Sequence, residues 1–134
     1  MTLINTIEFA ELGDERGSLV SLEENKNIPF DIKRVYYIFG TKDNVSRGFH
    51  AHKKLRQLAV CVKGACTIKM DDGCNIDYVT LDSPTQGLLI EAMQWHEMSD
   101  FAEDCVLMVL ANDYYDESDY IRDYKKFLEE VINV

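Results

Sequence analysis

The chain of 134 residues lacks the features that would set it apart from an ordinary globular protein. None of its apolar runs approaches the roughly 18–20 residues that cross a bilayer, so we expect no membrane partner. The first residues show no basic segment followed by an apolar one, which predicts no secretion signal and a cytoplasmic location. No linker, low-complexity tract or repeat interrupts the sequence. We therefore expect one domain over residues 1–134.

Positive charge is also scarce, with 14 Lys and Arg against 24 Asp and Glu and a net charge of -10. This balance argues against a nucleic-acid partner, which would need a basic face. The few cations are nevertheless clustered, since Arg47, Lys53, Lys54 and Arg56 lie close together. The cluster is either a solvated loop and strand edge or a local pocket for an anionic ligand such as a phosphate.

The four cysteines form no CxxC pair. They are Cys61, Cys66, Cys74 and Cys105, and most of them lie in apolar or alternating segments. We interpret them as reduced thiols that act as small core residues, with a metal or redox role as the alternative.

Short alternating segments separated by turns fill the first hundred or so residues. The stretch KRVYYIF, residues 33–39, is rich in β-branched and aromatic residues, and Asp72-Gly73 is a tight hairpin signal. Many short strands with regular turns are typical of an antiparallel sandwich or barrel.

The last segment has a different period. Ile121, Tyr124, Leu128 and Val131 follow one another at spacings of three and four. This pattern predicts one amphipathic helix over about 118–132, with Ser118 as its N-cap, packed against the β-structure.

Three histidines are the most informative residues. His50 and His52 are separated by one residue, so in a strand their side chains point to the same face. If that face lines a barrel, His96 from a later strand can reach the same cavity. Such a group can hold zinc or iron, or it can move protons near neutral pH. Buried histidines also often do no more than satisfy backbone partners.

Two stretches resemble the motifs of the cupins. GFHAHKKLRQLAVCVKG is similar to the first cupin motif and GLLIEAMQWHEM to the second. The resemblance implies an all-β fold, an RmlC-like antiparallel β-barrel or jelly roll, here with a C-terminal α-helix. It also places the three histidines at metal-ligand positions. However, Gln57 occupies the acidic ligand position, which disfavours a bound catalytic metal.

Over nearly its whole length the chain resembles one cupin subgroup, the dTDP-4-keto-6-deoxyhexose 3,4-ketoisomerases (FdtA/QdtA/WxcM-like). The specific motifs are RGFHAHK and the later YYDESDYIRDY. The resemblance implies an isomerase that converts dTDP-4-keto-6-deoxy-D-glucose to a dTDP-3-keto-6-deoxyhexose through an enediol. It implies no cofactor and no metal, and a place in making 3-amino-3,6-dideoxyhexoses for surface glycans such as O-antigens or S-layers.

The resemblance also implies catalytic roles for two histidines. His50 would be the base that acts on carbon, and His52 would carry a proton between the C3 and C4 oxygens. Histidine suits both tasks because it accepts and donates protons near neutral pH.

We expect four residues to bind the substrate or stabilise the developing oxyanion: Arg16, Tyr36, Arg47 and His96. Tyr36 and Tyr37 are adjacent, so in a regular strand only one points inward, and we prefer Tyr36. By resemblance, Arg16 together with His96 implies the axial, galacto-configured product. The tail tyrosines, Tyr114, Tyr115 and Tyr120, are expected mainly to pack, although one of them could line the pocket.

Two other functions remain open at this stage. The first is a metal-dependent cupin enzyme that uses His50, His52 and His96 as ligands. The second is a non-catalytic sugar-binding cupin. By analogy with cupins that exchange N-terminal strands, we expect a homodimer in which the stretch LINTIEF, residues 3–9, pairs with the partner.

Overall fold

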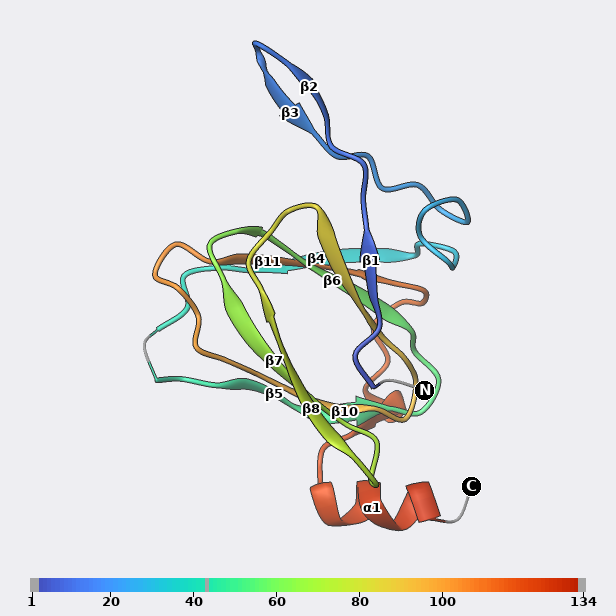
Figure 1. The fold of residues 1–134 in the computed structure, drawn as a ribbon. Helices are drawn as coiled ribbons and strands as arrows, with labels where there is room; N and C mark the ends of the chain where they lie inside the picture. Colours follow the sequence, from blue (N-terminus) through green and yellow to red (C-terminus); the bar gives the residue numbers. More distant parts are fainter. Residues whose placement is uncertain (1–2, 43, 133–134) are drawn as a thin grey trace.

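The computed structural model describes residues 3–42 and 44–132, and it folds into two facing antiparallel sheets (Figure 1). In spatial order the first sheet holds β1 (Thr6–Glu8), β9 (Gln86–Ile90), β6 (Gln57–Lys63), β11 (Val106–Ala111) and β4 (Arg34–Ile38). The second holds β12 (Tyr120–Ile121), β5 (Arg47–His52), β10 (Trp95–Ser99), β7 (Cys66–Asp71) and β8 (Ile76–Leu81). This all-β arrangement confirms the fold class expected from the sequence.

The main core lies between the two sheets because alternate residues of each strand point inward. On β6 the inward residues include Ala59 and Cys61, whereas Leu58 and Val60 belong to a separate apolar cluster. That second cluster covers the outer face of the first sheet beneath the segment 20–32. Gln57 stands on the inward face of β6 as well, so a polar group is placed at one end of an otherwise apolar interior.

A third small hairpin leaves the body of the molecule. It consists of β2 (Leu12–Asp14) and β3 (Gly17–Leu19), and Figure 1 shows it projecting away from both sheets. All six of its strand residues are exposed, including Leu12 and Leu19. Nothing in the described part of the chain packs on the apolar side chains of this hairpin. It therefore lacks the packing that normally stabilises a two-stranded hairpin.

The C-terminal segment corrects the expected helix of about 118–132. The helix α1 spans Tyr124–Ile132 and begins six residues later than expected. The preceding residues form a 3₁₀ turn, η1 (Glu117–Asp119), and the short strand β12. Asp123 rather than Ser118 caps the helix, because its carboxylate accepts a hydrogen bond from the backbone N–H of Lys125 at 2.9 Å.

The helix packs on the second sheet through aromatic side chains. Phe127 is fully buried against Trp95 and Ile121, with ring centroids of Phe127 and Trp95 5.7 Å apart. Trp95 is thus a core residue. Among the described residues, no helix has the length and apolar character needed to span a bilayer.

Candidate active site

The histidines meet on the inner face of the second sheet, as their spacing predicts. His50 and His52 both project from β5, with ring centroids 5.0 Å apart. His96 lies opposite His50 on the neighbouring strand β10, and these two rings are 4.5 Å apart. His52 and His96 are 2% and 1% exposed, whereas His50 is half-buried and faces open space.

A β-bulge aims His50 at this space. Across β5 and β10, His96 pairs with His50 but Glu97 pairs with Gly48, so Phe49 is an extra residue. Gly48 and Phe49 both have positive φ, 94° and 59°. A side chain at Gly48 would place its Cβ 2.9 Å from the carbonyl oxygen of His96, so this turn requires glycine. Bulges of this kind re-aim side chains beside functional sites.

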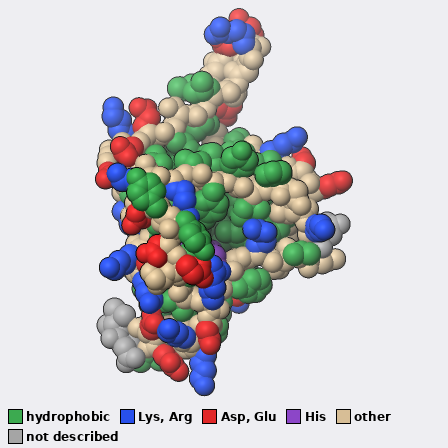
Figure 2. All heavy atoms as spheres, turned by 180° about the vertical axis from the view of Figure 1, so that it is seen from behind, with side chains coloured by type: hydrophobic (Ala, Val, Ile, Leu, Met, Phe, Trp, Pro, Cys, Tyr) green, Lys and Arg blue, Asp and Glu red, His purple; other side chains and the backbone are tan. Residues whose placement is uncertain are grey.

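His50 lies on the wall of a pocket of about 520 Å³. Figure 2 looks onto this side of the molecule and shows a histidine deep in a recess with Lys or Arg side chains around it. The polar and charged residues that line the pocket come from β4, β5 and the C-terminal segment, and include Arg34, Tyr36, Arg47, Tyr120 and Arg122. The pocket therefore combines one accessible imidazole with several cations, which suits an anionic ligand.

Backbone hydrogen bonds fix the tautomer of two histidines. The Nδ1–H of His50 donates to the carbonyl oxygen of Gly48 at 3.0 Å, which leaves Nε2 as the proton acceptor. His96 is held in the same way by the carbonyl oxygen of Gln94, at 3.3 Å. Burial lowers the pKa of His50 and lowers that of His96 to about 3, so both rings are neutral at neutral pH.

His52 is held by a different partner. Its Nδ1 lies 3.3 Å from Oδ2 of Asp119, close enough for an ion pair but without hydrogen-bond geometry. The two carboxylate oxygens of Asp119 accept hydrogen bonds from the backbone N–H groups of Lys54 and Leu55. Burial, followed by the neighbouring His50, lowers the pKa of His52 to about 4 despite this carboxylate. His52 lines a second, smaller recess of about 260 Å³ on the other side of Tyr120.

Packing was the main expectation for Tyr120 and lining of the pocket the alternative; Tyr120 stands between the two recesses and lines both. Its ring centroid is 4.3 Å from that of His52 and 4.9 Å from that of His50. The guanidinium of Arg122 covers the same ring at 4.2 Å, and Arg122 is itself paired with Glu117 at 2.8 Å. No local pattern indicated this position, because the segment was read as helical.

Tyr36, and not Tyr37, points into the barrel. Its ring lines the large pocket, whereas Tyr37 is 64% exposed on the outer face. Gln57 Nε2 donates to the Tyr36 hydroxyl oxygen at 2.7 Å, which leaves the hydroxyl proton free to donate elsewhere. Burial raises the pKa of Tyr36 to about 12, so it remains a hydrogen-bond donor at neutral pH.

Arg16 is the expected site residue that its own chain does not bring to the pocket. It lies at the turn of the projecting hairpin, with its side chain 85% exposed and paired with Asp14 at 2.5 Å. Arg47, in contrast, lines the large pocket. The described part of a single chain therefore unites His50, Tyr36, Arg47 and His96 in one region and leaves Arg16 outside it.

The histidines do not present a ready metal site. Among the described residues, the group of three ligand atoms that lie within 4.8 Å of one another consists of cysteines and not histidines. Gln57 offers a neutral amide where a carboxylate would help to hold a cation, and its Nε2 is already donated to the Tyr36 hydroxyl oxygen. The donor set present therefore fits a catalytic metal poorly.

The buried histidines make stability depend on pH. We expect the free energy of unfolding to fall on acidification below about pH 6.5. In this range His52 and His96 are protonated in the unfolded chain but stay neutral in the folded protein, so protons favour the unfolded state. Each contributes a loss of about 1.4 kcal/mol per pH unit until its folded pKa is reached. Urea titrations at about pH 7 and about pH 5 measure the slope. A His96→Gln variant should show a shallower slope, and an equal slope would contradict this origin.

Comparison with known proteins gives a consistent picture. A curated TDP-4-oxo-6-deoxy-alpha-D-glucose-3,4-oxoisomerase from Aneurinibacillus thermoaerophilus is 59% identical over 128 residues, covering 96% of this chain and 92% of the relative. A mutant of the 3,4-ketoisomerase QdtA from Thermoanaerobacterium thermosaccharolyticum, solved in complex with TDP-4-keto-6-deoxyglucose, is 41% identical with a TM-score of 0.96, covering 99% of this chain and 96% of that one.

A more distant structure identifies the fold. The rmlC epimerase of Mycobacterium tuberculosis superposes with a TM-score of 0.73 at 19% identity, covering 86% of this chain and 66% of that chain. The fold is therefore the RmlC-like cupin barrel. The family model described as FdtA: WxcM-like, C-terminal, matches residues 2–132. The chain belongs to this FdtA family.

Proposed function

We propose that this protein is a 3,4-ketoisomerase that converts dTDP-4-keto-6-deoxy-D-glucose to a dTDP-3-keto-6-deoxyhexose. One observation carries the proposal. His50 is neutral, its Nδ1–H is fixed by the Gly48 carbonyl, and its Nε2 is left as a base on the wall of a cation-rich pocket. The relatives that share this fold at high identity act on the same class of compound.

The first step is removal of the proton from C3 of the sugar by His50 Nε2. Electrons from the C3–H bond form a C3–C4 double bond, and the C4 carbonyl becomes an enediolate oxygen. The imidazolium that results keeps its Nδ1–H bonded to the Gly48 carbonyl, so the ring does not turn away. Because burial disfavours the charged ring, His50 returns its proton readily.

The enediolate needs donors to stabilise its charge. The Tyr36 hydroxyl suits this role because Gln57 occupies its oxygen as a donor and leaves the O–H available. Arg47 supplies a positive charge from the same pocket. Arg34 stacks on Tyr36, with its guanidinium 5.2 Å from the ring centroid, and holds that ring in place.

The second half of the reaction delivers a proton to C4 and removes the hydroxyl proton from O3. We assign the transfer between the two oxygens to His52, whose ring is 5.0 Å from that of His50. The carboxylate of Asp119, 3.3 Å from Nδ1 of His52, stabilises the charged ring when it carries the proton. No metal enters this scheme, in keeping with the poor metal fit of the histidines.

We further propose that the product has the axial, galacto configuration at C4. The support is the combination of Arg16 and His96, which resembles the branch of the family that gives this product. The product would lead to a 3-amino-3,6-dideoxyhexose for surface glycans, and we place the enzyme in the cytoplasm, where nucleotide sugars are made.

Proton NMR in D2O tests the proposal. Chelator-treated protein is incubated with dTDP-4-keto-6-deoxyglucose, and we expect the carbonyl to move to C3 with solvent deuterium at C4. The coupling of the C4 proton, observed in a parallel H2O reaction, reports axial or equatorial product. Turnover that appears only after iron or zinc is added would instead support a metal-dependent enzyme. Binding without turnover under either condition would support a sugar-binding module.

Arg16 and the exposed apolar surface together favour a homodimer. The hairpin carries exposed Leu12 and Leu19, and the outer face of β4 exposes Val35 and Tyr37 at 52% and 64%. A second copy is the occupant that would cover both surfaces by one symmetry operation. We propose that the hairpin of one protomer then carries Arg16 to the pocket of its partner.

Mixed dimers test this arrangement. Arg16→Ala and His50→Ala should each be nearly inactive alone. If Arg16 acts across the interface, dimers formed by coexpression regain about a quarter of wild-type activity, because half are mixed and each has one complete site. Glu15→Ala, at the same hairpin turn, is the matched control and should keep its activity. No recovery in mixtures that contain mixed dimers would contradict the proposal.

A further inference from the structure

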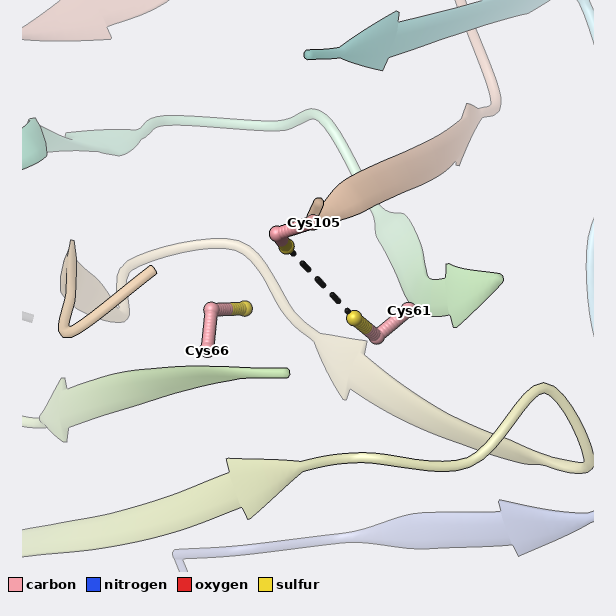
Figure 3. Close-up of side chains that lie close together, drawn as sticks. All are labelled: Cys61, Cys66 and Cys105. Carbon is pink, nitrogen blue, oxygen red and sulfur yellow. Dashed lines mark hydrogen bonds between the residues drawn. The ribbon is translucent and has the colours of Figure 1, made fainter. Parts of the chain in front are cut away.

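Three cysteines from three strands meet inside the barrel, away from the histidines. Cys61 belongs to β6, Cys66 opens β7, and Cys105 directly precedes β11. Their sulfur atoms all lie within 4.8 Å of one another, and Sγ of Cys61 is 3.6 Å from Sγ of Cys105 (Figure 3). Cys61 is four residues beyond Gln57 on the same face of β6, so the cluster lies about 13 Å along the strand from the Tyr36–Gln57 pair.

This trithiol cluster (Cys61, Cys66 and Cys105) lies in the apolar core, with one backbone contact, a hydrogen bond from the Cys61 thiol to the Lys63 carbonyl oxygen at 3.2 Å. Each of the three side chains is 1% exposed or less and belongs to the core between the sheets. Burial raises the pKa of Cys61 to about 12 and raises that of Cys66 as well, so these thiols are protonated and neutral. The described fold thus holds three soft ligand atoms in a site without charge.

The spacing of the sulfurs suits a single three-coordinate ion. With bonds to sulfur of about 2.3 Å, a pyramidal three-coordinate centre places the sulfurs about 3.5 Å apart. The sulfurs of Cys61 and Cys105 are 3.6 Å apart, and that of Cys66 lies within 4.8 Å of both. Soft ions are the ones that thiolates select. Small movements of side chains already in place would complete the coordination.

Charge decides between the soft ions. Three thiolates carry three negative charges. The complex therefore has a net charge of −2 with a monovalent ion, −1 with a divalent ion and zero with a trivalent centre. Because an uncompensated charge in an apolar interior is costly, the site favours the trivalent case.

We propose that Cys61, Cys66 and Cys105 form a binding site for trivalent arsenic. Arsenous acid, As(OH)3, reacts with three thiols to give As(SR)3 and three waters. Three As–O and three S–H bonds break, while three As–S and three O–H bonds form, and no atom changes oxidation state. Both the reactant and the adduct are uncharged, so neither entry nor binding places a charge in the core.

Two turns adjoin the cluster, and we infer that a ligand enters between them. Cys66 follows the turn at Gly64, and Cys105 follows an exposed turn that contains Glu103 and Asp104. A hydrogen bond from Ala102 N–H to the Ala65 carbonyl oxygen, 2.8 Å long, ties these turns together. Arsenic must open this link to enter, so we expect slow binding followed by slow release.

Native mass spectrometry with sodium arsenite tests the proposal, with a phosphine in place of a thiol reductant. Wild-type protein should gain one arsenic atom and lose three protons, and X-ray absorption at the arsenic edge should show three sulfur neighbours. Cys66→Ala should lose this adduct, whereas Cys74→Ser, which alters the exposed fourth cysteine, should keep it. Circular dichroism checks that each variant is folded.

Three results would overturn the inference. They are an arsenic with two sulfur neighbours in wild-type protein, an adduct that Cys74→Ser abolishes, and displacement of arsenic by an equal concentration of Cd2+. The wild-type measurements stand even if Cys66→Ala does not fold. Because the readout is binding and not turnover, it is independent of the proposed ketoisomerase activity.

Discussion

Replacing His50 by asparagine is expected to lower kcat about 10³-fold, which corresponds to about 4 kcal/mol of transition-state free energy. Asparagine is of similar size and can still donate to the Gly48 carbonyl, but it has no basic nitrogen to replace Nε2. The substrate should bind as before, because the cations of the pocket are unchanged. Steady-state kinetics measure the loss of kcat, and the Kd for the dTDP-linked sugar product measures binding separately.

A second readout makes this prediction specific to the base. Exchange of the C3 proton with solvent, followed by NMR, should disappear in His50→Asn together with turnover. Lys53→Ala is the matched control, since Lys53 is an exposed residue just after the same strand. Retention of C3 exchange in His50→Asn would assign the base to another residue, with His96, Tyr120 and His52 as the nearest candidates.

Replacing Phe127 by alanine is expected to lower the free energy of unfolding by about 3–5 kcal/mol. Phe127 is fully buried and joins α1 to Trp95 and Ile121, so its removal leaves a cavity between the helix and the second sheet. Chemical denaturation measures the loss. Ile132→Ala, on the same helix but 81% exposed, should change stability by less than about 0.5 kcal/mol.

The Phe127 variant also separates stability from activity. At a temperature where it is folded, it should retain most of its turnover, because Phe127 does not contact the histidines. A large loss of kcat in folded protein would mean that α1 positions β12, and with it Tyr120, more tightly than the contacts of Phe127 indicate. Loss of less than about 1 kcal/mol would show that the helix is not anchored through this ring.

Local patterns were sufficient for the parts of the site that depend on strand alternation. One residue between His50 and His52 placed both on one face, and the parity of Tyr36 distinguished it from Tyr37. The all-β fold followed from turn spacing and from the cupin motifs. Strand alternation and turn signals depend on residues that are neighbours in the sequence, so they can be recognised without knowledge of the three-dimensional structure.

The pairing of the C-terminal segment with a distant strand was not predictable from local patterns. The spacing of Ile121, Tyr124 and Leu128 fits one helix, but Ile121 instead pairs with Ala51 of β5 as a strand. That pairing, and not the local period, brings Asp119 and Tyr120 beside His52. A short strand gains its stability from its neighbour, and the neighbour is far away in the sequence.

The placement of Arg16 has a related cause. Resemblance marked it as a substrate-binding residue, whereas the fold of one chain carries it outward on the hairpin. A single sequence does not show whether a residue contributes to the site of its own chain or to the site of a partner protomer. The mixed-dimer experiment addresses that choice directly.

The pairing of β12 with β5 also has a consequence for how the enzyme matures. A chain is synthesised from its N-terminus, so the histidine strand emerges from the ribosome long before Asp119 and Tyr120, which hold His52. Until they arrive, β5 is an edge strand with unpaired backbone groups. The site is thus completed only after the segment 117–121 has been translated, and a nascent chain that ends before this segment lacks the carboxylate of Asp119 and the ring of Tyr120 beside His52.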